Sequence, residues 1–262
     1  MKLLAIGDVF GAAGRRALEK WLREVREETA ADFVVVNVEN LHHGKGVDPP
    51  GARAVLDLGA DCLTSGNHVW AGKNHDKLLE VEPRLIRPAN YPAPCPGRGV
   101  FLGEARGGAR VCVFNLVGRV FMAPVDDPFR VADDIVRELN GHADVVALDI
   151  HAEATSEKLA LALHLDGRVA AVFGTHTHVQ TADARVLPRG AGFISDLGMT
   201  GPYESVIGLE ADGVVRRFAT ARPLQVAPAD GGLGLRGALF DIDETTGRCR
   251  SVVRIVRGAG GQ

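Results

Sequence analysis

The chain has 262 residues, which at roughly 100–200 residues per domain corresponds to one large domain or two small ones. Its formal net charge is −3, and this near-neutral balance argues against a protein that a strongly basic surface holds on nucleic acid. Hydrophobic residues make up 46% and charged residues 24%, a composition typical of a folded globular protein. No convincing linker divides the chain, so we expect a single domain over residues 1–262.

The cysteines and the N-terminal segment indicate the compartment. The apolar run after Met1 stops at Gly7-Asp8, before it reaches the roughly 7–15 residues that a signal peptide needs. No stretch approaches the roughly 18 apolar residues of a membrane span. No C-x-x-C pair that would suggest a zinc ribbon or redox motif occurs among the four cysteines, Cys62, Cys95, Cys112 and Cys249. We therefore expect a cytoplasmic protein with reduced thiols and no membrane partner.

The first part of the chain alternates between predicted strands and helices. Short apolar, β-branched runs predict buried strands, and apolar residues at helical spacing predict the helices between them. In chain order the prediction is a strand at Lys2–Ile6, a helix at Arg15–Glu28, a strand at Phe33–Val38, a helix at Pro50–Leu58 and a strand at Asp61–Thr64. The Pro- and Gly-rich segment Pro83–Gly108 is expected to form a long ordered loop.

The same alternation continues and then changes in the last third. The predicted elements are a strand at Arg110–Leu116, a helix at Pro128–Leu139, a strand at Asp144–Ile150, a helix at Thr155–Leu165 capped by Thr155 or Ser156, and a strand at Val169–Phe173. Gly192–Ile194 and segments within Arg216–Ile255 resemble strands with few helices between them, and residues 258–262 are expected to fray. The pattern predicts an α/β fold in which helices pack on a largely central sheet that antiparallel strands complete.

Five of the predicted strands end in side chains that can bind a metal ion. These side chains are Asp8, Glu39 with Asn40, Asn67 with His68, His151, and His176 with His178. Each has an ordinary alternative as a turn residue, a helix cap or a core histidine. The strongest single signal is His176-x-His178, since residues two apart in an extended segment share a face. Ligand sites gather at the carboxyl ends of strands in open α/β sheets, so the joint pattern favours one shared site.

A dinucleotide-binding turn is the main rival explanation. Gly7, Gly11 and Gly14 follow the first strand and open a helix, and Glu39 ends the second strand like a ribose-binding acid. The glycine spacing is not G-x-G-x-x-G, however, and Asp8 stands where a pyrophosphate would lie. This interpretation also leaves the strand-end histidines unexplained.

Seven long segments stand out along the chain: IGDVFG (6–11), NVEN (37–40), SGNHVW (65–70), RPANYP (87–92), DIHAEATSEK (149–158), GTHTHVQTAD (174–183) and ISDLGMTGP (194–202). Together they resemble the calcineurin-like metallophosphoesterases, and more specifically the YmdB-type family of bacterial phosphodiesterases. The resemblance covers nearly the whole chain. It implies a four-layer α/β/β/α sandwich with a two-metal site at the strand ends.

The resemblance also implies a role for each strand-end residue. It places a first metal on Asp8, Glu39, Asn40 and His178, and a second on Glu39, Asn67, His151 and His176, so that Glu39 bridges the two. His68 would be the proton donor. Phe10 stands where the broader superfamily has a histidine, and Glu39 where it has an aspartate. Both departures are features of the YmdB-type subgroup, and Phe10 leaves the first metal one imidazole short.

Elementary chemistry agrees with such a site. Two divalent ions about 3.5–4 Å apart can clamp the attacking and leaving oxygens of a phosphoryl transfer, and a bound water ionises near pH 7 to supply the attacking hydroxide. The mixed nitrogen and oxygen donors suit iron, manganese or zinc better than calcium. The resemblance favours iron or manganese.

The resemblance implies a hydrolase that acts on small phosphodiesters, notably 2′,3′-cyclic nucleotides. A diester needs its leaving alkoxide protonated, which gives His68 a task. One alternative is a broad phosphomonoesterase or protein phosphatase on the same site. Another is a metal-stabilised regulatory protein associated with RNA. A small nucleotide or phosphodiester is thus the expected partner, and weak RNA contact and oligomer formation stay open.

Overall fold

The computed structural model describes residues 1–72, 74–139 and 141–259 and has a mixed α/β fold. The first half comprises β1 (Lys2–Ile6), α1 (Gly11–Thr29), β2 (Phe33–Asn37), α2 (Pro49–Asp57), β3 (Cys62–Thr64), α3 (His75–Val81), β4 (Val100–Glu104), β5 (Arg110–Val117) and α4 (Pro128–Leu139). The second half comprises β6 (Val145–His151), α5 (Thr155–Leu165), β7 (Ala171–Thr175), β8 (Arg185–Val186), β9 (Gly192–Ile194), β10 (Gly201–Pro202), α6 (Ala211–Thr220), β11 (Leu233–Asp243) and β12 (Arg248–Gly258).

The strands form two six-stranded sheets. The first has the order β10-β11-β1-β2-β3, with β12 paired to β11. In it β1, β2 and β3 are parallel, whereas β11 runs antiparallel to β1 with Ala5 opposite Ala238. The second sheet has the order β4-β5-β6-β7-β9-β8, with β5, β6, β7 and β9 parallel and antiparallel strands at both edges. The carboxyl ends of the parallel strands in each sheet are therefore places where a ligand could bind.

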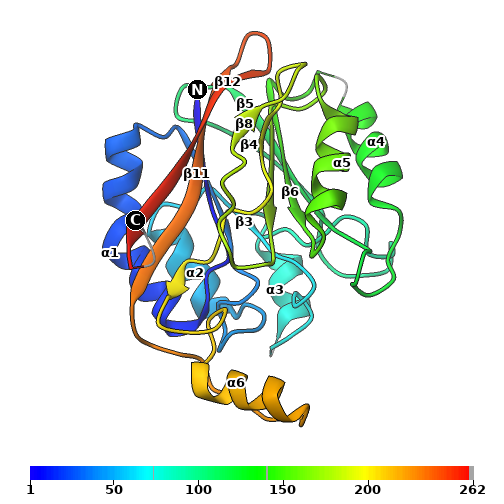
Figure 1. The fold of residues 1–262 in the computed structure, drawn as a ribbon. Coiled ribbons are helices and arrows are strands. Elements are labelled where there is room, and N and C mark those ends of the chain that lie inside the picture. The colour runs from blue at the N-terminus through cyan, green and yellow to red at the C-terminus, as the bar shows by residue number, and fades with distance from the viewer. Residues whose placement is uncertain (73, 140, 260–262) are drawn as a thin grey trace.

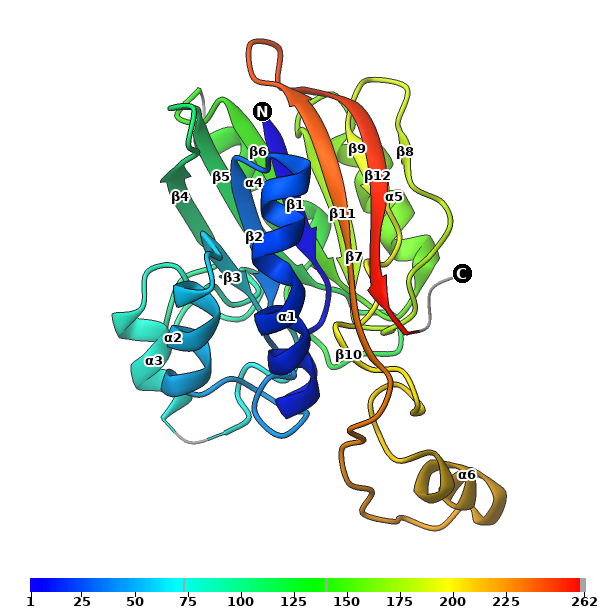
Figure 2. The ribbon, with the colours of Figure 1, turned by 90° about the vertical axis from the view of Figure 1, so that its left-hand side faces the viewer.

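The ribbon views show helices on the outer faces of two sheets (Figures 1 and 2). Three apolar cores fill the spaces between these four layers. One core joins α1 and α2 to the outer face of the first sheet, with members such as Leu18, Val34 and Val55. A second fills the space between the sheets. The third joins α4 and α5 to the second sheet. The order of helices, sheet, sheet and helices confirms the predicted α/β/β/α sandwich.

Helix α6 stands apart from this sandwich. Both ribbon views show it at the end of an extended excursion between β10 and β11 (Figures 1 and 2). Val214 is its one buried residue among those described, while Val215 and Phe218 are largely exposed. The excursion leaves and rejoins the first sheet beside the carboxyl ends of the parallel strands, so the residues at its start can reach those strand ends.

Most predicted elements are present, with shifted ends. The helix expected from Arg15 begins at Gly11. The prediction missed this first turn because the small residues before Arg15 show no apolar periodicity, although they allow close packing. A Cβ atom at Gly14 would lie 2.5 Å from the carbonyl oxygen of Thr200. The expected cap on α5 is wrong: Ala154, not Thr155 or Ser156, occupies the N-cap position. The frayed end expected at 258–262 lies largely outside the described residues, and Gly258 still belongs to β12.

Several elements were not predicted. Strand β4 lies inside the segment expected to be a loop, where it pairs with β5 at a sheet edge. Helix α3 has only 7 residues, and α6 buries too little apolar surface to show a clear stripe. Among the helices in the described ranges, none is long and apolar enough to span a bilayer.

Candidate functional site

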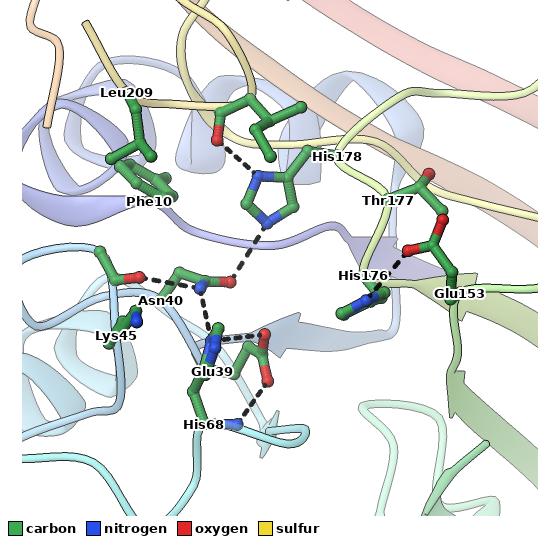
Figure 3. A pocket seen from close by; sticks show the side chains of 12 residues that line it. Phe10, Glu39, Asn40, Lys45, His68, Glu153, His176, Thr177, His178 and Leu209 are labelled. Atoms are coloured by element: carbon green, nitrogen blue, oxygen red, sulfur yellow. Dashed lines mark hydrogen bonds and ion pairs between the residues drawn. The ribbon is translucent and has the colours of Figure 1, made fainter. Parts of the chain in front are cut away.

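The strand-end residues of both sheets converge on one pocket of about 420 Å³ (Figure 3). Five of the eight residues expected at the site line this pocket: Glu39, Asn40, His68, His176 and His178. Of the other three, Asp8 contacts His176, His151 contacts Glu39, and Asn67 contacts His151. Strands β1, β2 and β3 of one sheet and β6 and β7 of the other thus deliver their terminal side chains to a common place.

His151 lies at the centre of the first of two groups within the site. Its Nε2 atom is 3.1 Å from Glu39 Oε2, 3.0 Å from Asn67 Oδ1 and 3.0 Å from His176 Nδ1. Ligand atoms that each lie about 2.0–2.2 Å from one ion are roughly 3–3.5 Å from one another. Glu39, His151 and His176 are accordingly the residues whose donor atoms, all within 4.8 Å of one another, could hold a metal ion.

The second group consists of Asp8, Asn40 and His178. Asn40 Oδ1 lies 3.3 Å from His178 Nε2, and Asp8 Oδ1 lies 3.9 Å from the same nitrogen. The other ring nitrogen of His178 bonds the carbonyl oxygen of Ile207 at 2.9 Å, which fixes the ring with Nε2 facing Asp8. Asp8 Oδ2 accepts the backbone N–H of His176 at 3.1 Å, whereas its fully buried Oδ1 has no hydrogen-bond partner among the described residues.

His68 lies between the two groups at the open side. Its Nδ1 atom is 3.3 Å from Glu39 Oε1 and 3.2 Å from Asn40 Nδ2. Its backbone N–H also donates to Glu39 Oε2, so the loop after β3 is tied to the end of β2. The side chain is 31% exposed, which leaves Nε2 available to a molecule in the pocket.

Two carboxylates, Asp8 and Glu39, are buried in the site beside the imidazoles of His151 and His176. Burial raises the pKa of Asp8. Burial alone would raise the pKa of Glu39, but the imidazoles of His151 and His68 hold it well below its ordinary value. Burial also disfavours the charged form of His151, yet Glu39, Asp8 and Asp149 raise its pKa to about 9. Burial and the charge of His151 lower the pKa of His176 to about 3. The charge states of these four side chains therefore depend on one another, as expected for ionisable groups packed together out of water.

Phe10, two residues after Asp8, stands where the resemblance to the broader superfamily implies a ligand histidine. It is 4% exposed, and its ring meets the His178 ring edge-on with centroids 5.6 Å apart. The ring lies between Gly44 and Gly208, where an added Cβ atom would come within 2.8 Å and 2.7 Å of it. With Ile207 and Leu209 from the start of the α6 excursion, Phe10 gives the pocket an apolar wall.

A polar network below the site was not predicted. Asp149 accepts hydrogen bonds from Asn37 Nδ2 at 2.9 Å, Thr64 Oγ1 at 2.5 Å and Thr175 Oγ1 at 2.7 Å. Because the Thr175 hydroxyl donates to Asp149, its oxygen accepts from His151 Nδ1 at 2.9 Å. Each of these polar residues lies within the last three residues of an otherwise apolar strand, and this placement in the sequence could have indicated the network.

Comparison with known proteins places the chain in a family. The sequence pattern of the YmdB-like proteins matches residues 4–255. The chain belongs to the YmdB-like family. It is 41% identical over 256 residues to the 2′,3′-cyclic-nucleotide 2′-phosphodiesterase of Bacillus subtilis (strain 168), covering 98% of this chain and 97% of that protein.

Two solved structures of nearly the same length as this chain have the same fold. A crystal structure of a hypothetical protein from Thermus thermophilus superposes with a TM-score of 0.93 at 41% identity, covering 99% of this chain and 100% of the other. A novel phosphatase from Mycoplasma pneumoniae gives a TM-score of 0.93 at 33% identity, covering 99% and 94%. These matches confirm the predicted YmdB-type resemblance and the prediction that the chain is an enzyme of the hydrolase class.

Proposed function

We propose that this YmdB-like chain is a metal-dependent phosphodiesterase that uses two metal ions. Glu39, Asn67, His151 and His176 would hold one ion, Asp8, Glu39, Asn40 and His178 the other, and Glu39 would bridge them. The observation that carries the proposal is the buried, unpartnered Oδ1 atom of Asp8, which among the described residues lies beside the donor atoms of a second cluster. Leaving a buried carboxylate oxygen without a partner is costly unless a cation completes it.

The residues present fit divalent metal ions. Nitrogen and carboxylate or amide oxygen donors suit iron, manganese and zinc, and among these we propose iron or manganese. Because the Thr175 hydroxyl accepts from His151 Nδ1, the Nε2 lone pair on the opposite side of the ring would be available to an ion beside Glu39. When bound, the ions would supply positive charge for the phosphoryl group and lower the pKa of bound water.

The chain's own residues would then orient the substrate and move one proton. His68 lies at the open side, and when its Nδ1–H donates to Glu39 Oε1 at 3.3 Å its Nε2 can face the leaving oxygen. We propose that it donates the proton that an unactivated ribose oxygen needs on departure. Burial of Asp8 and His151 excludes bulk water from the floor of the pocket.

We propose small phosphodiesters, and 2′,3′-cyclic nucleotides in particular, as substrates. The apolar wall of Phe10, Ile207 and Leu209 suits the face of a nucleobase, and the exposed Lys45 at the rim suits an anionic substrate. The Bacillus subtilis relative is named for the same substrate class. We further propose a cytoplasmic enzyme in which residues 1–262 form one domain, since both sheets contribute to one site.

Two measurements on the same protein test this function. Metal content by elemental analysis should approach two ions per chain. Turnover of 2′,3′-cyclic AMP should greatly exceed that of p-nitrophenyl phosphate. Preference for the monoester would instead favour a phosphomonoesterase. RNA affinity that survives removal of the metals, without turnover of either substrate, would favour an RNA-associated regulatory protein.

A further inference from the structure

The loop that carries His176 and His178 has an unusual backbone. His176 has φ +102° and His178 has φ +65°, both in the left-handed region that side chains other than glycine rarely adopt. Such a conformation persists only where the surroundings hold it. What holds this loop therefore determines where both imidazoles point.

A buried ion pair lies directly behind the loop. Lys158, in the first turns of α5, and Asp196, after β9, are both fully buried. Lys158 Nζ lies 2.8 Å from Asp196 Oδ2. A Cβ atom at Gly174 would lie 2.7 Å from Lys158 Cδ, so the glycine leaves room for the lysine stem. Burying two charges is costly, and hydrogen bonds to both partners offset part of that cost.

The pair holds the backbone on both sides of His176. Lys158 Nζ donates to the carbonyl oxygen of Thr175 at 2.8 Å. Asp196 Oδ2 accepts the N–H of Thr177 at 3.0 Å. The N–H of His176 itself donates to Asp8. The peptide groups before and after His176 are thus fixed by one ion pair, which leaves the ring with Nδ1 directed at His151 Nε2.

We propose that Lys158 and Asp196 are positioning residues that keep His176 in its left-handed conformation for metal binding. Neither residue touches the pocket. They act through Thr175 and Thr177, and loss of the pair would let the loop relax and turn His176 away from Glu39 and His151. This inference rests on the proposed metal role of His176.

The test compares Mn²⁺ affinity among variants, measured from the free Mn²⁺ signal in electron paramagnetic resonance. Lys158→Met keeps the buried stem and removes the ammonium, and Asp196→Asn removes the carboxylate charge. Residues that support metal ligands typically contribute about 10–100-fold in metal affinity. Each variant should therefore bind Mn²⁺ about 10–100-fold more weakly while its circular dichroism stays that of a folded protein.

Arg26→Met is the matched structural control. Arg26 is also nearly buried and pairs with Asp61 at 3.0 Å, but it bonds the loops that precede β2 and β3, at the opposite ends of those strands from the site. Its loss should lower the melting temperature and leave Mn²⁺ affinity within about 2-fold. If Lys158 only stabilised the fold, Lys158→Met would behave like this control, with a lower melting temperature and nearly unchanged Mn²⁺ affinity.

Two outcomes separate this inference from the proposed function. If His176→Ala binds Mn²⁺ like the wild type, the metal role of His176 is wrong. If His176→Ala weakens binding and folded Lys158→Met does not, only the positioning role is overturned. Should Lys158→Met fail to fold because Asp196 is left unpaired, the double variant Lys158→Met/Asp196→Asn removes both charges and is judged by the same affinity.

Discussion

His68 has the most exposed imidazole ring of the site, 31% against 21% for His176, and its Nε2 has no hydrogen-bond partner in the described part of the chain. The Nδ1 contacts to Glu39 and Asn40 set the ring orientation from behind. Such a residue can act on substrate without binding metal. Its contribution should then depend on how much the leaving group needs a proton.

We expect His68→Ala to lose about 10²–10⁴-fold in rate on 2′,3′-cyclic AMP, the usual contribution of a general acid. On a p-nitrophenyl phosphodiester the loss should be far smaller, because p-nitrophenolate leaves without protonation. Metal content should stay at the wild-type level. Steady-state kinetics on both substrates checks this, and equal losses with intact metals would point to stabilisation of transition-state charge instead.

Glu39 is the carboxylate that we propose to bridge the two ions, and it has one oxygen toward His151 and the other toward His68. We expect Glu39→Gln to lower metal content well below two ions per chain. The matched control is Glu19→Gln, which makes the same chemical change at an exposed residue of α1 that does not line the pocket. That variant should keep its metals by elemental analysis. A fully loaded Glu39→Gln variant would show that Glu39 is no bridge.

At the scale of elements, strand β7 contributes to the site through the hydroxyl of its last residue, Thr175, and through the histidines in the loop that follows it. Thr175 Oγ1 connects His151 Nδ1 to Asp149. Thr175→Val keeps the shape of the side chain but removes this connection, so metal affinity should fall about 10–100-fold. Thr175→Ser retains the hydroxyl and should bind as the wild type does. Isothermal titration with Mn²⁺ distinguishes the two, and equal affinities would mean that Thr175 does not orient His151.

The sequence predicted the strands that carry the site better than the elements around them. Asp8, Glu39, His151 and His176 follow continuous apolar runs, and such runs mark buried parallel strands whose ends share an edge. The family resemblance supplied the grouping of these residues. The local pattern could not reveal Lys158, because an isolated lysine on a helix is usually solvated and its burial depends on contacts distant in the sequence.

The sequence pattern also failed to predict the elements that bury little surface. Helix α6 exposes 80% of Phe218 and 60% of Val215, so its apolar residues do not mark a core-facing stripe. Strand β4 pairs on one side only and lies in a segment rich in turn-forming residues. Its pairing with β5 is decided by the tertiary structure and not by local propensity.

At the scale of the whole molecule, the site crosses the boundary between the two sheets. Asp8 and Glu39 come from the first sheet, and His151 and His176 from the second. Ions bound there would connect the sheets only in the folded state. Stabilisation by a ligand at about 100 times its Kd is about 2.7 kcal/mol, and in a chain of this size 1 kcal/mol shifts Tm by roughly 2–4 °C.

Removal of metal with a chelator should therefore lower Tm by about 5–10 °C for each site emptied. Differential scanning calorimetry with and without Mn²⁺ measures the shift. The Glu39→Gln variant serves as the control, since a protein that binds little metal should show little further change. A wild-type Tm that does not respond to metal would contradict a site that joins the two sheets.

The pairing of β1 with β11 has a consequence for how the chain acquires its structure. Leu3 lies opposite Phe240, so nearly the whole chain separates two partners in adjacent strands. Both residues also belong to the core between the sheets. While the chain is being synthesised, β1 keeps an unpaired edge and that core stays open until β11 emerges. Final closure must then bring distant segments together, which makes it a slow, late step of folding and the stage most exposed to aggregation.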